Sequence, residues 1–171
     1  MGRLEVVPGD LTRQDTDAIV NAANTTLIGA GGVAAAIQRA AGPQILPALA
    51  ALGGCPTGEA RITPGFRLPA RFVIHAVGPV WRGGTHREDE LLASAYRHAL
   101  ALAVANGLRS IAFPSISTGI FGFPLERASR IAVGEVRRFM AEHPEIELVR
   151  FVCFSDEVLR AYRAASEEAA I

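Results

Sequence analysis

The chain has 171 residues, a length typical of one domain, and half of them are hydrophobic, which is enough for a core and argues against a disordered protein. Its 17 basic residues are all arginines and are balanced by 17 acidic ones, so the chain lacks the overall positive charge that sequence-independent nucleic-acid binding favours. The absence of lysine excludes mechanisms that need a lysine Schiff base or the lysine of a Walker A loop.

Short apolar runs alternate with amphipathic segments along the whole chain. The runs typical of strands are 4–7, 18–21, 59–63, 72–77, 110–113 and 148–154. The segments with helical spacing of apolar residues are 32–41, 45–52, 88–106, 124–140 and 157–169. Such alternation predicts a single α/β domain over 1–171, a three-layer α/β/α sandwich around a mostly parallel sheet.

The two cysteines, Cys55 and Cys153, lie far apart and form no CxxC motif, so we expect free thiols and no zinc site. Free thiols are typical of a reducing compartment, and because a strand pattern begins at Leu4 we expect no signal peptide. No apolar run reaches the length of a membrane span. We therefore expect a cytoplasmic, monomeric protein that binds no metal, no cofactor and no membrane.

Three loops follow predicted strands at the sheet edge where ligands bind in parallel α/β folds. Segment 21–33 places glycines directly before a helix, whose N-terminus attracts anions, and segment 18–58 contains no acidic residue. Segment 114–124 combines small hydroxyl residues with glycines and can present backbone N–H groups to a pyrophosphate. Phe154 ends the last strand, where an aromatic ring can stack on a base.

Each of these features also has a simpler interpretation. The first loop could be an ordinary turn before an alanine-rich helix, and aromatic residues near a helix start, such as Phe121 and Phe123, more often pack in a core. Segment 29–34 fits the dinucleotide-binding fingerprint G-x-G-x-x-A, but no strand runs into its first glycine and no acidic residue follows at the required spacing. We reject that fingerprint. His75, inside an apolar strand, is interpreted as a core histidine, and His86 as a solvated loop residue.

Taken in order, several motifs resemble those of macrodomains, and specifically of the MacroD-type subgroup. The motifs that resemble macrodomains in general are Gly9-Asp10-Leu11-Thr12, the run 17–24 and Gly31-Gly32-Val33. Those that resemble the MacroD-type subgroup are the runs 39–43, 52–58, 72–79 and 115–124. The resemblance covers nearly the whole chain. It implies a six-stranded mixed central sheet and a site for ADP-ribose or for an ADP-ribosylated protein.

The resemblance also implies a role for individual residues, carried over by position. Asp10 would accept a hydrogen bond from the adenine amine beside the Leu11 backbone, and Phe154 would lie against the adenine. Asn24 would bind the distal ribose, which Gly31, Gly32 and Val33 would wrap together with the phosphates. The residues that would cradle the diphosphate are Ser117, Thr118, Gly119, Ile120, Phe121 and Gly122, with Phe121 also covering the distal ribose.

One departure from the resemblance concerns catalysis. MacroD-type hydrolases carry Gly-Gly-Val-Asp-Gly and then Ile-His-Arg-Ala-Ala-Gly, whereas this chain has Ala34 in place of the aspartate, Ala35 in place of its glycine and Gln38 in place of the histidine. In the family that aspartate orients or activates the attacking water, and other macrodomain hydrolases use a lysine, which this chain lacks. Asn24 is then the one residue of catalytic type that the pattern retains.

These observations predict an ADP-ribose-binding module with weak or no hydrolase activity. The alternative is an active hydrolase of mono-ADP-ribosyl protein or O-acetyl-ADP-ribose, which would use Asn24 and water positioned by the substrate phosphates. Binding of single-stranded RNA in the same cleft is a third hypothesis, disfavoured because no basic groove with interleaved aromatic residues is visible.

Overall fold

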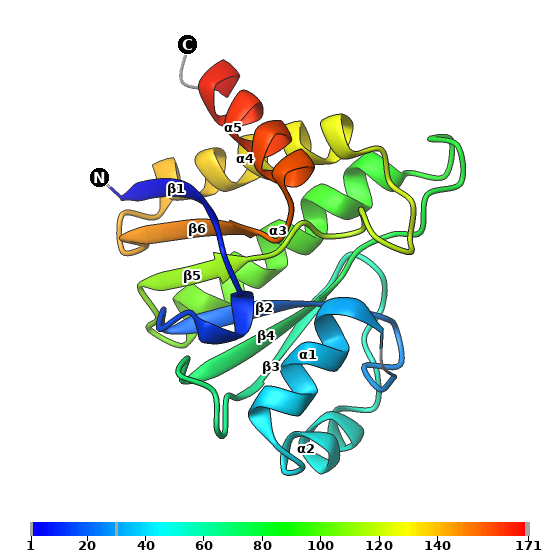
Figure 1. The fold of residues 1–171 in the computed structure, drawn as a ribbon, viewed down its shortest axis with the longest axis vertical. Coiled ribbons are helices and arrows are strands. Elements are labelled where there is room, and N and C mark those ends of the chain that lie inside the picture. Colours follow the sequence, from blue (N-terminus) through cyan, green and yellow to red (C-terminus); the bar gives the residue numbers. More distant parts are fainter. Residues whose placement is uncertain (1, 30, 170–171) are drawn as a thin grey trace.

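A computed structural model describes residues 2–29 and 31–169, which form one six-stranded sheet covered by helices on both faces (Figure 1). The strands are β1 (Arg3–Pro8), β2 (Ala18–Ala23), β3 (Ala60–Pro64), β4 (Phe72–Val77), β5 (Ser110–Phe113) and β6 (Leu148–Cys153). They lie in the order β1-β6-β5-β2-β4-β3. All neighbouring strands are parallel except β3 and β4, which are antiparallel, so the predicted mixed and mostly parallel sheet is confirmed.

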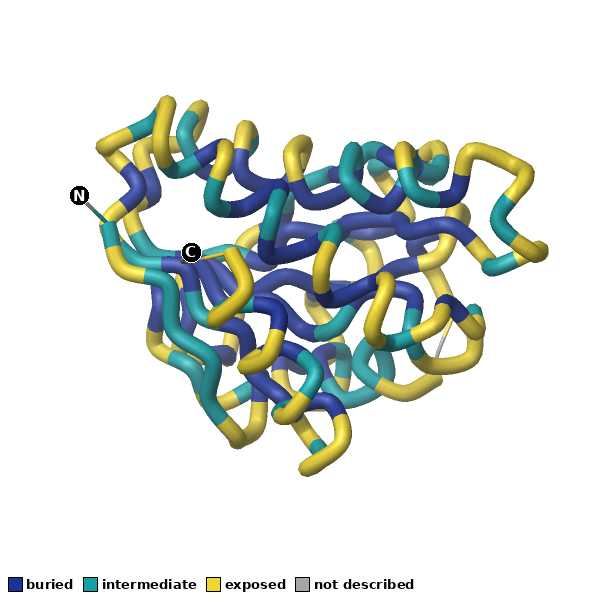
Figure 2. The backbone as a smooth tube through the Cα atoms, turned by 90° about the horizontal axis from the view of Figure 1, so that it is seen from above, coloured by how far each residue is buried: buried dark blue, intermediate teal, exposed yellow. Residues whose placement is uncertain are grey.

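Five α-helices flank the sheet in the described residues. They are α1 (Gly32–Ala41), α2 (Ile45–Leu52), α3 (Glu88–Ala105), α4 (Leu125–Glu142) and α5 (Asp156–Ala169). Helices α1 and α2 contribute to one apolar cluster, and α3, α4 and α5 contribute to another on the opposite face of the sheet. The buried strands run between these two layers, as the view from above shows (Figure 2). No described helix combines the length and apolarity that a bilayer crossing needs.

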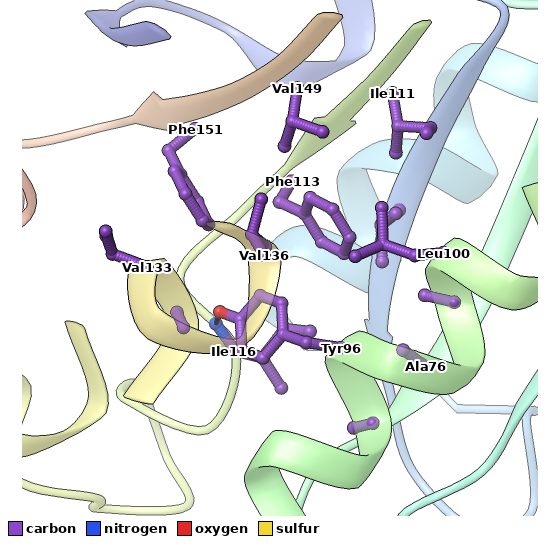
Figure 3. Packing of buried hydrophobic residues seen from close by; sticks show 14 of the residues in the cluster. Ala76, Tyr96, Leu100, Ile111, Phe113, Ile116, Val133, Val136, Val149 and Phe151 are labelled. Carbon is purple, nitrogen blue, oxygen red and sulfur yellow. Dashed lines mark hydrogen bonds between the residues drawn. The ribbon is translucent and has the colours of Figure 1, made fainter. Parts of the chain in front are cut away.

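Alternation along the strands explains why both faces are apolar. On β2, Ile19 belongs to the cluster under α1 and α2, whereas Val20 belongs to the cluster under α3, α4 and α5. The second cluster has an aromatic centre, in which the ring of Tyr96 lies 5.0 Å from that of Phe113 and 6.2 Å from that of Phe151 (Figure 3).

The predicted elements all exist, and their ends differ from the predicted bounds by at most two residues. One element was not predicted, a short 3-10 helix (Leu11–Arg13) that follows β1. The backbone of this turn carries Asp10 and Leu11 to the same sheet edge as the three predicted loops.

Glu88 begins α3 and connects this helix to the loop before it. Its side chain is buried and accepts hydrogen bonds from the backbone N–H groups of Arg82 (2.9 Å), Gly84 (2.8 Å) and His86. Burial alone would raise the pKa of Glu88, but these hydrogen bonds outweigh burial and lower the pKa to about 2. Glu88 therefore holds the 82–86 loop against the start of α3.

Candidate ligand-binding cleft

A cleft of about 660 Å³ opens at the carboxyl ends of the parallel strands. The turn after β1 and all three predicted loops contribute to its wall. Every ligand-binding residue predicted from the sequence lines this cleft except Gly122, which lies just beyond its edge. The predicted residues in the lining are Asp10, Leu11, Asn24, Gly31, Gly32, Val33, Ser117, Thr118, Gly119, Ile120, Phe121 and Phe154.

At one end of the cleft, Asp10 and Phe154 follow the neighbouring parallel strands β1 and β6. Oδ1 of Asp10 accepts hydrogen bonds from the side-chain hydroxyl (2.7 Å) and the backbone N–H (2.9 Å) of Thr12. The hydroxyl bond is the main reason that the pKa of this carboxyl lies below its usual value. Phe154 presents an aromatic ring that is 78% exposed. Asp10 thus caps a turn and lines the cleft at the same time.

The 114–124 loop, which connects β5 to α4, folds back on itself. Ser117 has a positive φ of 68°, and its carbonyl accepts a hydrogen bond from the N–H of Phe123 at 2.9 Å. Gly122 also has a positive φ, 72°, and donates to the Gly119 carbonyl at 3.0 Å. Gly122 therefore shapes the end of the loop, and its role as a direct ligand contact stays a prediction.

Buried hydroxyl groups fix this loop from below. The Tyr162 hydroxyl donates to Oγ of Ser115 at 2.9 Å, and Oγ of Ser115 lies 2.6 Å from Oγ1 of Thr118. The Tyr96 hydroxyl accepts a hydrogen bond from the N–H of Ile116 at 3.2 Å. Burial raises the pKa of Tyr162 to about 12, so its hydroxyl remains a donor at any physiological pH. The sequence pattern indicated none of these tyrosine contacts, because α3 and α5 are distant from the loop along the chain.

Gly78 lies directly behind the same loop. A Cβ atom there would collide with Oγ of Ser117 and come within 2.5 Å of Cγ2 of Ile116. The missing side chain at Gly78 therefore allows Ser117 to sit at the cleft wall.

The opposite end of the cleft is formed by the loop after β2 and the first turn of α1. Oδ1 of Asn24 accepts a hydrogen bond from the Thr26 hydroxyl at 2.8 Å, and its Nδ2 donates to the Ile28 carbonyl at 3.3 Å. Gln38 donates from Nε2 to the Gly29 carbonyl at 3.1 Å and ties the loop to α1. Ala34 lines the cleft, and Ala35 does not belong to the lining.

The charge in this cleft is sparse. Among the described residues that line it, Asp10 is the one with an ionisable side chain. No group of three or more potential metal-ligating side chains occurs in the described part of the chain. The cleft therefore offers an anionic ligand backbone N–H groups and a helix N-terminus rather than charged side chains.

Two buried polar atoms in the cleft wall lack a hydrogen-bond partner among the described residues, Oδ1 of Asn21 and Oγ of Ser117. Such atoms are uncommon in native proteins, and a hydrogen bond to a bound ligand is one explanation for them. Asn21 was not among the predicted site residues, because it lies in an apolar strand. An asparagine inside such a run is the feature that could have identified it.

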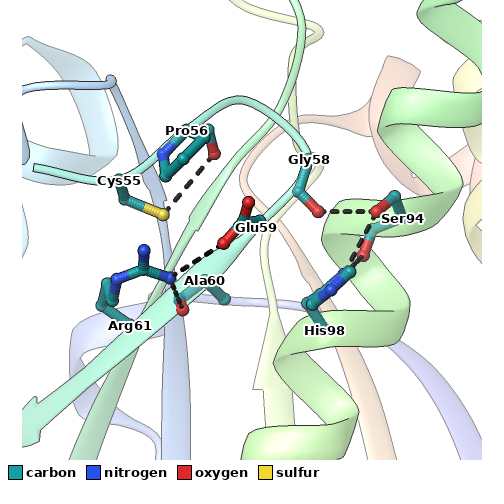
Figure 4. A network of polar contacts seen from close by, with 8 residues as sticks. All are labelled: Cys55, Pro56, Gly58, Glu59, Ala60, Arg61, Ser94 and His98. Atoms are coloured by element: carbon teal, nitrogen blue, oxygen red, sulfur yellow. Dashed lines mark hydrogen bonds and ion pairs between the residues drawn. The ribbon is translucent and has the colours of Figure 1, made fainter.

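Behind the first loop lies a polar network at the start of β3 (Figure 4). Cys55 donates from Sγ to the Pro56 carbonyl at 3.6 Å, and its backbone N–H donates to the Thr25 carbonyl at 2.9 Å. Burial raises the pKa of the Cys55 thiol. Cys55 and Cys153 are both buried free cysteines, as predicted, and this segment supports the loop rather than contributing a nucleophile.

The fold and the cleft define an α/β/α domain with a cleft at the carboxyl ends of its parallel strands. Residues 20–132 match the Macro domain family, and the chain belongs to that family. It is 58% identical over 162 residues to a Macro domain-containing protein of Chlorobaculum tepidum, covering 95% of this chain and 94% of that protein. It is 54% identical over 164 residues to a protein of Salmonella newport named O-acetyl-ADP-ribose deacetylase, covering 94% of this chain and 92% of that one.

Solved structures agree with these relatives. The Oceanobacillus iheyensis macrodomain with ADP is 43% identical and superposes with a TM-score of 0.95, covering 99% of this chain and 92% of that one. A Trypanosoma brucei macrodomain in complex with ADP-ribose is 46% identical with a TM-score of 0.89, covering 94% of this chain and 68% of that one.

Proposed function

We propose that this macrodomain binds ADP-ribose, free or carried as a mono-ADP-ribosyl group or as O-acetyl-ADP-ribose. It hydrolyses the bond that joins ADP-ribose to the protein or to acetate weakly or not at all. The complexes of similar macrodomains with ADP and ADP-ribose support the choice of ligand. The cleft supports it too, because it combines an exposed aromatic ring, a loop of backbone N–H groups and a helix N-terminus in one continuous wall.

The composition of the cleft wall carries the proposal of weak hydrolysis. Ala34 occupies the position at which MacroD-type motifs place a carboxylate, and the one ionisable group in the described lining, Asp10, is at the other end. The side-chain amide of Asn24 has hydrogen-bond partners within its own loop, and an amide is not a general base at neutral pH. The site can therefore position a substrate without supplying a base for the attacking water.

The name of the Salmonella relative favours a second candidate function, deacetylation of O-acetyl-ADP-ribose. That activity here would rest on Asn24 and on water positioned by the substrate phosphates. Positioning alone can leave a measurable rate when a catalytic group is missing.

Two measurements test the proposal on the same preparation. In calorimetric titrations we expect ADP-ribose to bind more tightly than AMP or ribose 5-phosphate, because only ADP-ribose spans both ends of the cleft. Equal affinity for AMP would contradict the assignment of the distal end. The release of ADP-ribose from a mono-ADP-ribosylated protein and of acetate from O-acetyl-ADP-ribose should be slow, and rapid turnover would favour the hydrolase instead.

A further inference from the structure

A row of three polar side chains crosses the face of the sheet that α1 and α2 cover. Asn21 on β2 is paired in register with His75 on β4, and Thr63 lies on the adjacent strand β3. Their exposed fractions are 1%, 0% and 4%. On β2 and β4 the other residues of this face, such as Ile19 and Val73, are apolar. Polar groups in such surroundings are costly unless they are hydrogen-bonded to one another.

The contacts within the row determine where its protons lie. Nδ2 of Asn21 can only donate, and it lies 3.1 Å from Nδ1 of His75, so this ring nitrogen accepts. A neutral imidazole then carries its proton on Nε2, which donates to Oγ1 of Thr63 at 2.9 Å. Burial lowers the pKa of His75 to about 4 and keeps the ring neutral.

Asn21, at one end of the row, connects it to the cleft. Because Nδ2 of Asn21 faces His75, the carbonyl oxygen Oδ1 is on the other side of the planar amide. Asn21 lines the cleft, and its Oδ1 has no hydrogen-bond partner among the described residues. An amide oxygen accepts hydrogen bonds and repels the oxygens of an ionised phosphate, so it needs a donor. With the adenine amine assigned to Asp10, the remaining donors of ADP-ribose are its hydroxyls. Within ADP-ribose the hydroxyls belong to the riboses.

We propose that His75, held as the Nε2–H tautomer by Thr63, is a positioning residue that fixes the Asn21 carbonyl oxygen as an acceptor for a ribose hydroxyl of the bound nucleotide. This inference rests on the proposed binding of ADP-ribose. If the proton moved to Nδ1, the imidazole would donate to the Asn21 oxygen, the amide would rotate by half a turn, and its NH₂ group would face the cleft. The tautomer of His75, which is outside the cleft lining, thereby determines whether Asn21 offers the ligand an acceptor or a donor.

Thr63→Val tests this arrangement because valine keeps the shape of threonine and removes the acceptor for Nε2–H, and Thr63 itself does not line the cleft. We expect the ADP-ribose dissociation constant to rise about two- to tenfold, the range for one lost hydrogen bond. Thr63→Ser, which retains a hydroxyl, should restore it. Thr16→Val is the matched control, because it removes a buried hydroxyl that donates to the Ala18 carbonyl at 2.8 Å away from the cleft. The control should melt at a lower temperature with unchanged affinity.

Long-range ¹H–¹⁵N spectra of the imidazole give a second readout that needs no ligand. The wild-type protein should show His75 as the Nε2–H tautomer, and Thr63→Val should shift it toward Nδ1–H. An Nδ1–H tautomer in the wild type would overturn the proposal, as would unchanged affinity in Thr63→Val. A wild-type protein that fails to bind ADP-ribose but shows the expected tautomers would refute the proposed function while supporting the proton assignment.

Discussion

Gly31 and Ile120 face each other across the cleft, so close that a Cβ atom at Gly31 would lie 3.6 Å from Cδ1 of Ile120. Gly31 caps α1 and Ile120 stands at the tip of the loop after β5, so two segments far apart in the sequence meet here. The side chain of Ile120 is 91% exposed and adds almost nothing to the core. Its exposed position in the cleft wall, opposite Gly31, indicates a role in covering the ligand.

Replacing Ile120 by alanine should therefore loosen the ligand and leave the fold intact. A bound nucleotide would bury part of this side chain, worth about 1 kcal/mol at the usual value per unit of apolar area. We expect ADP-ribose to dissociate roughly fivefold faster, measured by stopped-flow displacement, with an unchanged melting temperature. Leu46→Ala, at a 45% exposed position on α2 outside the cleft lining, serves as the control. Equal dissociation rates for both variants would rule out a covering role.

Gly78→Ala should distort the wall of the cleft. Its methyl group would collide with Ser117 and push the 114–124 loop outward, so we expect about tenfold weaker ADP-ribose binding together with a lower melting temperature. Gly134→Ala on α4 is the matched control, because a Cβ atom there meets nothing within 4 Å, the backbone is not in the left-handed region and Gly134 does not line the cleft. If both alanines behave alike, the contact between Gly78 and Ser117 does not position the loop.

Asp10→Ala separates two roles of one carboxylate. A charge-assisted hydrogen bond to the adenine amine is worth about 1.5–3 kcal/mol, so ADP-ribose should bind at least about tenfold more weakly. Gln14→Ala provides the comparison, since Nε2 of Gln14 supports the same turn by donating to the Asp10 carbonyl at 3.1 Å, outside the cleft lining. Should Asp10→Ala lower only the melting temperature, as Gln14→Ala is expected to do, Asp10 would be a turn cap and no more.

Ala34→Asp should raise the hydrolysis of a mono-ADP-ribosylated protein or of O-acetyl-ADP-ribose by about 10²–10⁴-fold, the usual contribution of a positioned general base. Ala34 lies in the first turn of α1, where a negative side chain is tolerated and even favoured. Because Ala35 does not line the cleft, the single substitution should suffice, and adding Ala35→Gly should change the rate little. Time-resolved release of ADP-ribose from wild type and both variants decides this. Variants that bind ADP-ribose but react no faster than wild type would show that Ala34 is not the missing position.

His75 should make the free energy of unfolding depend on pH. In the unfolded chain His75 binds a proton below its ordinary pKa of 6.5, whereas in the folded protein its pKa is about 4. Between these two values the unfolded state binds more protons, so the free energy of unfolding falls as the pH drops through this window. The pKa difference corresponds to a total loss of about 3 kcal/mol. Urea unfolding between pH 4.5 and 7.5 should show a shallower decline for His75→Gln than for wild type. Parallel curves would mean that His75 is not held neutral.

How far the sequence could predict this protein is clearest from two elements and from two residues, His75 and Tyr162. The helix at 32–41 and the strand at 72–77 have the predicted bounds, because apolar spacing and flanking glycines act over a few neighbouring residues. His75 was correctly interpreted as a core residue, yet its link to Asn21 depends on the pairing of β2 with β4, which no local pattern encodes. Tyr162 supports Ser115 across 47 positions of the chain, and only the packing of α5 brings the two hydroxyls together.

The order of the strands has a consequence for how the protein is made. Of the six strands described, β1 is the first in the sequence and lies at the edge of the sheet, where it pairs with β6, the last of the six, which fills the place between β1 and β5. Asp10 and Phe154 can therefore face the same ligand only after residues 148–154 have left the ribosome. Contacts of such long sequence separation form late and slowly. A chain stalled before residue 148 should be unable to retain ADP-ribose, so capture of the ligand would report that β6 has been synthesised and has paired with β1.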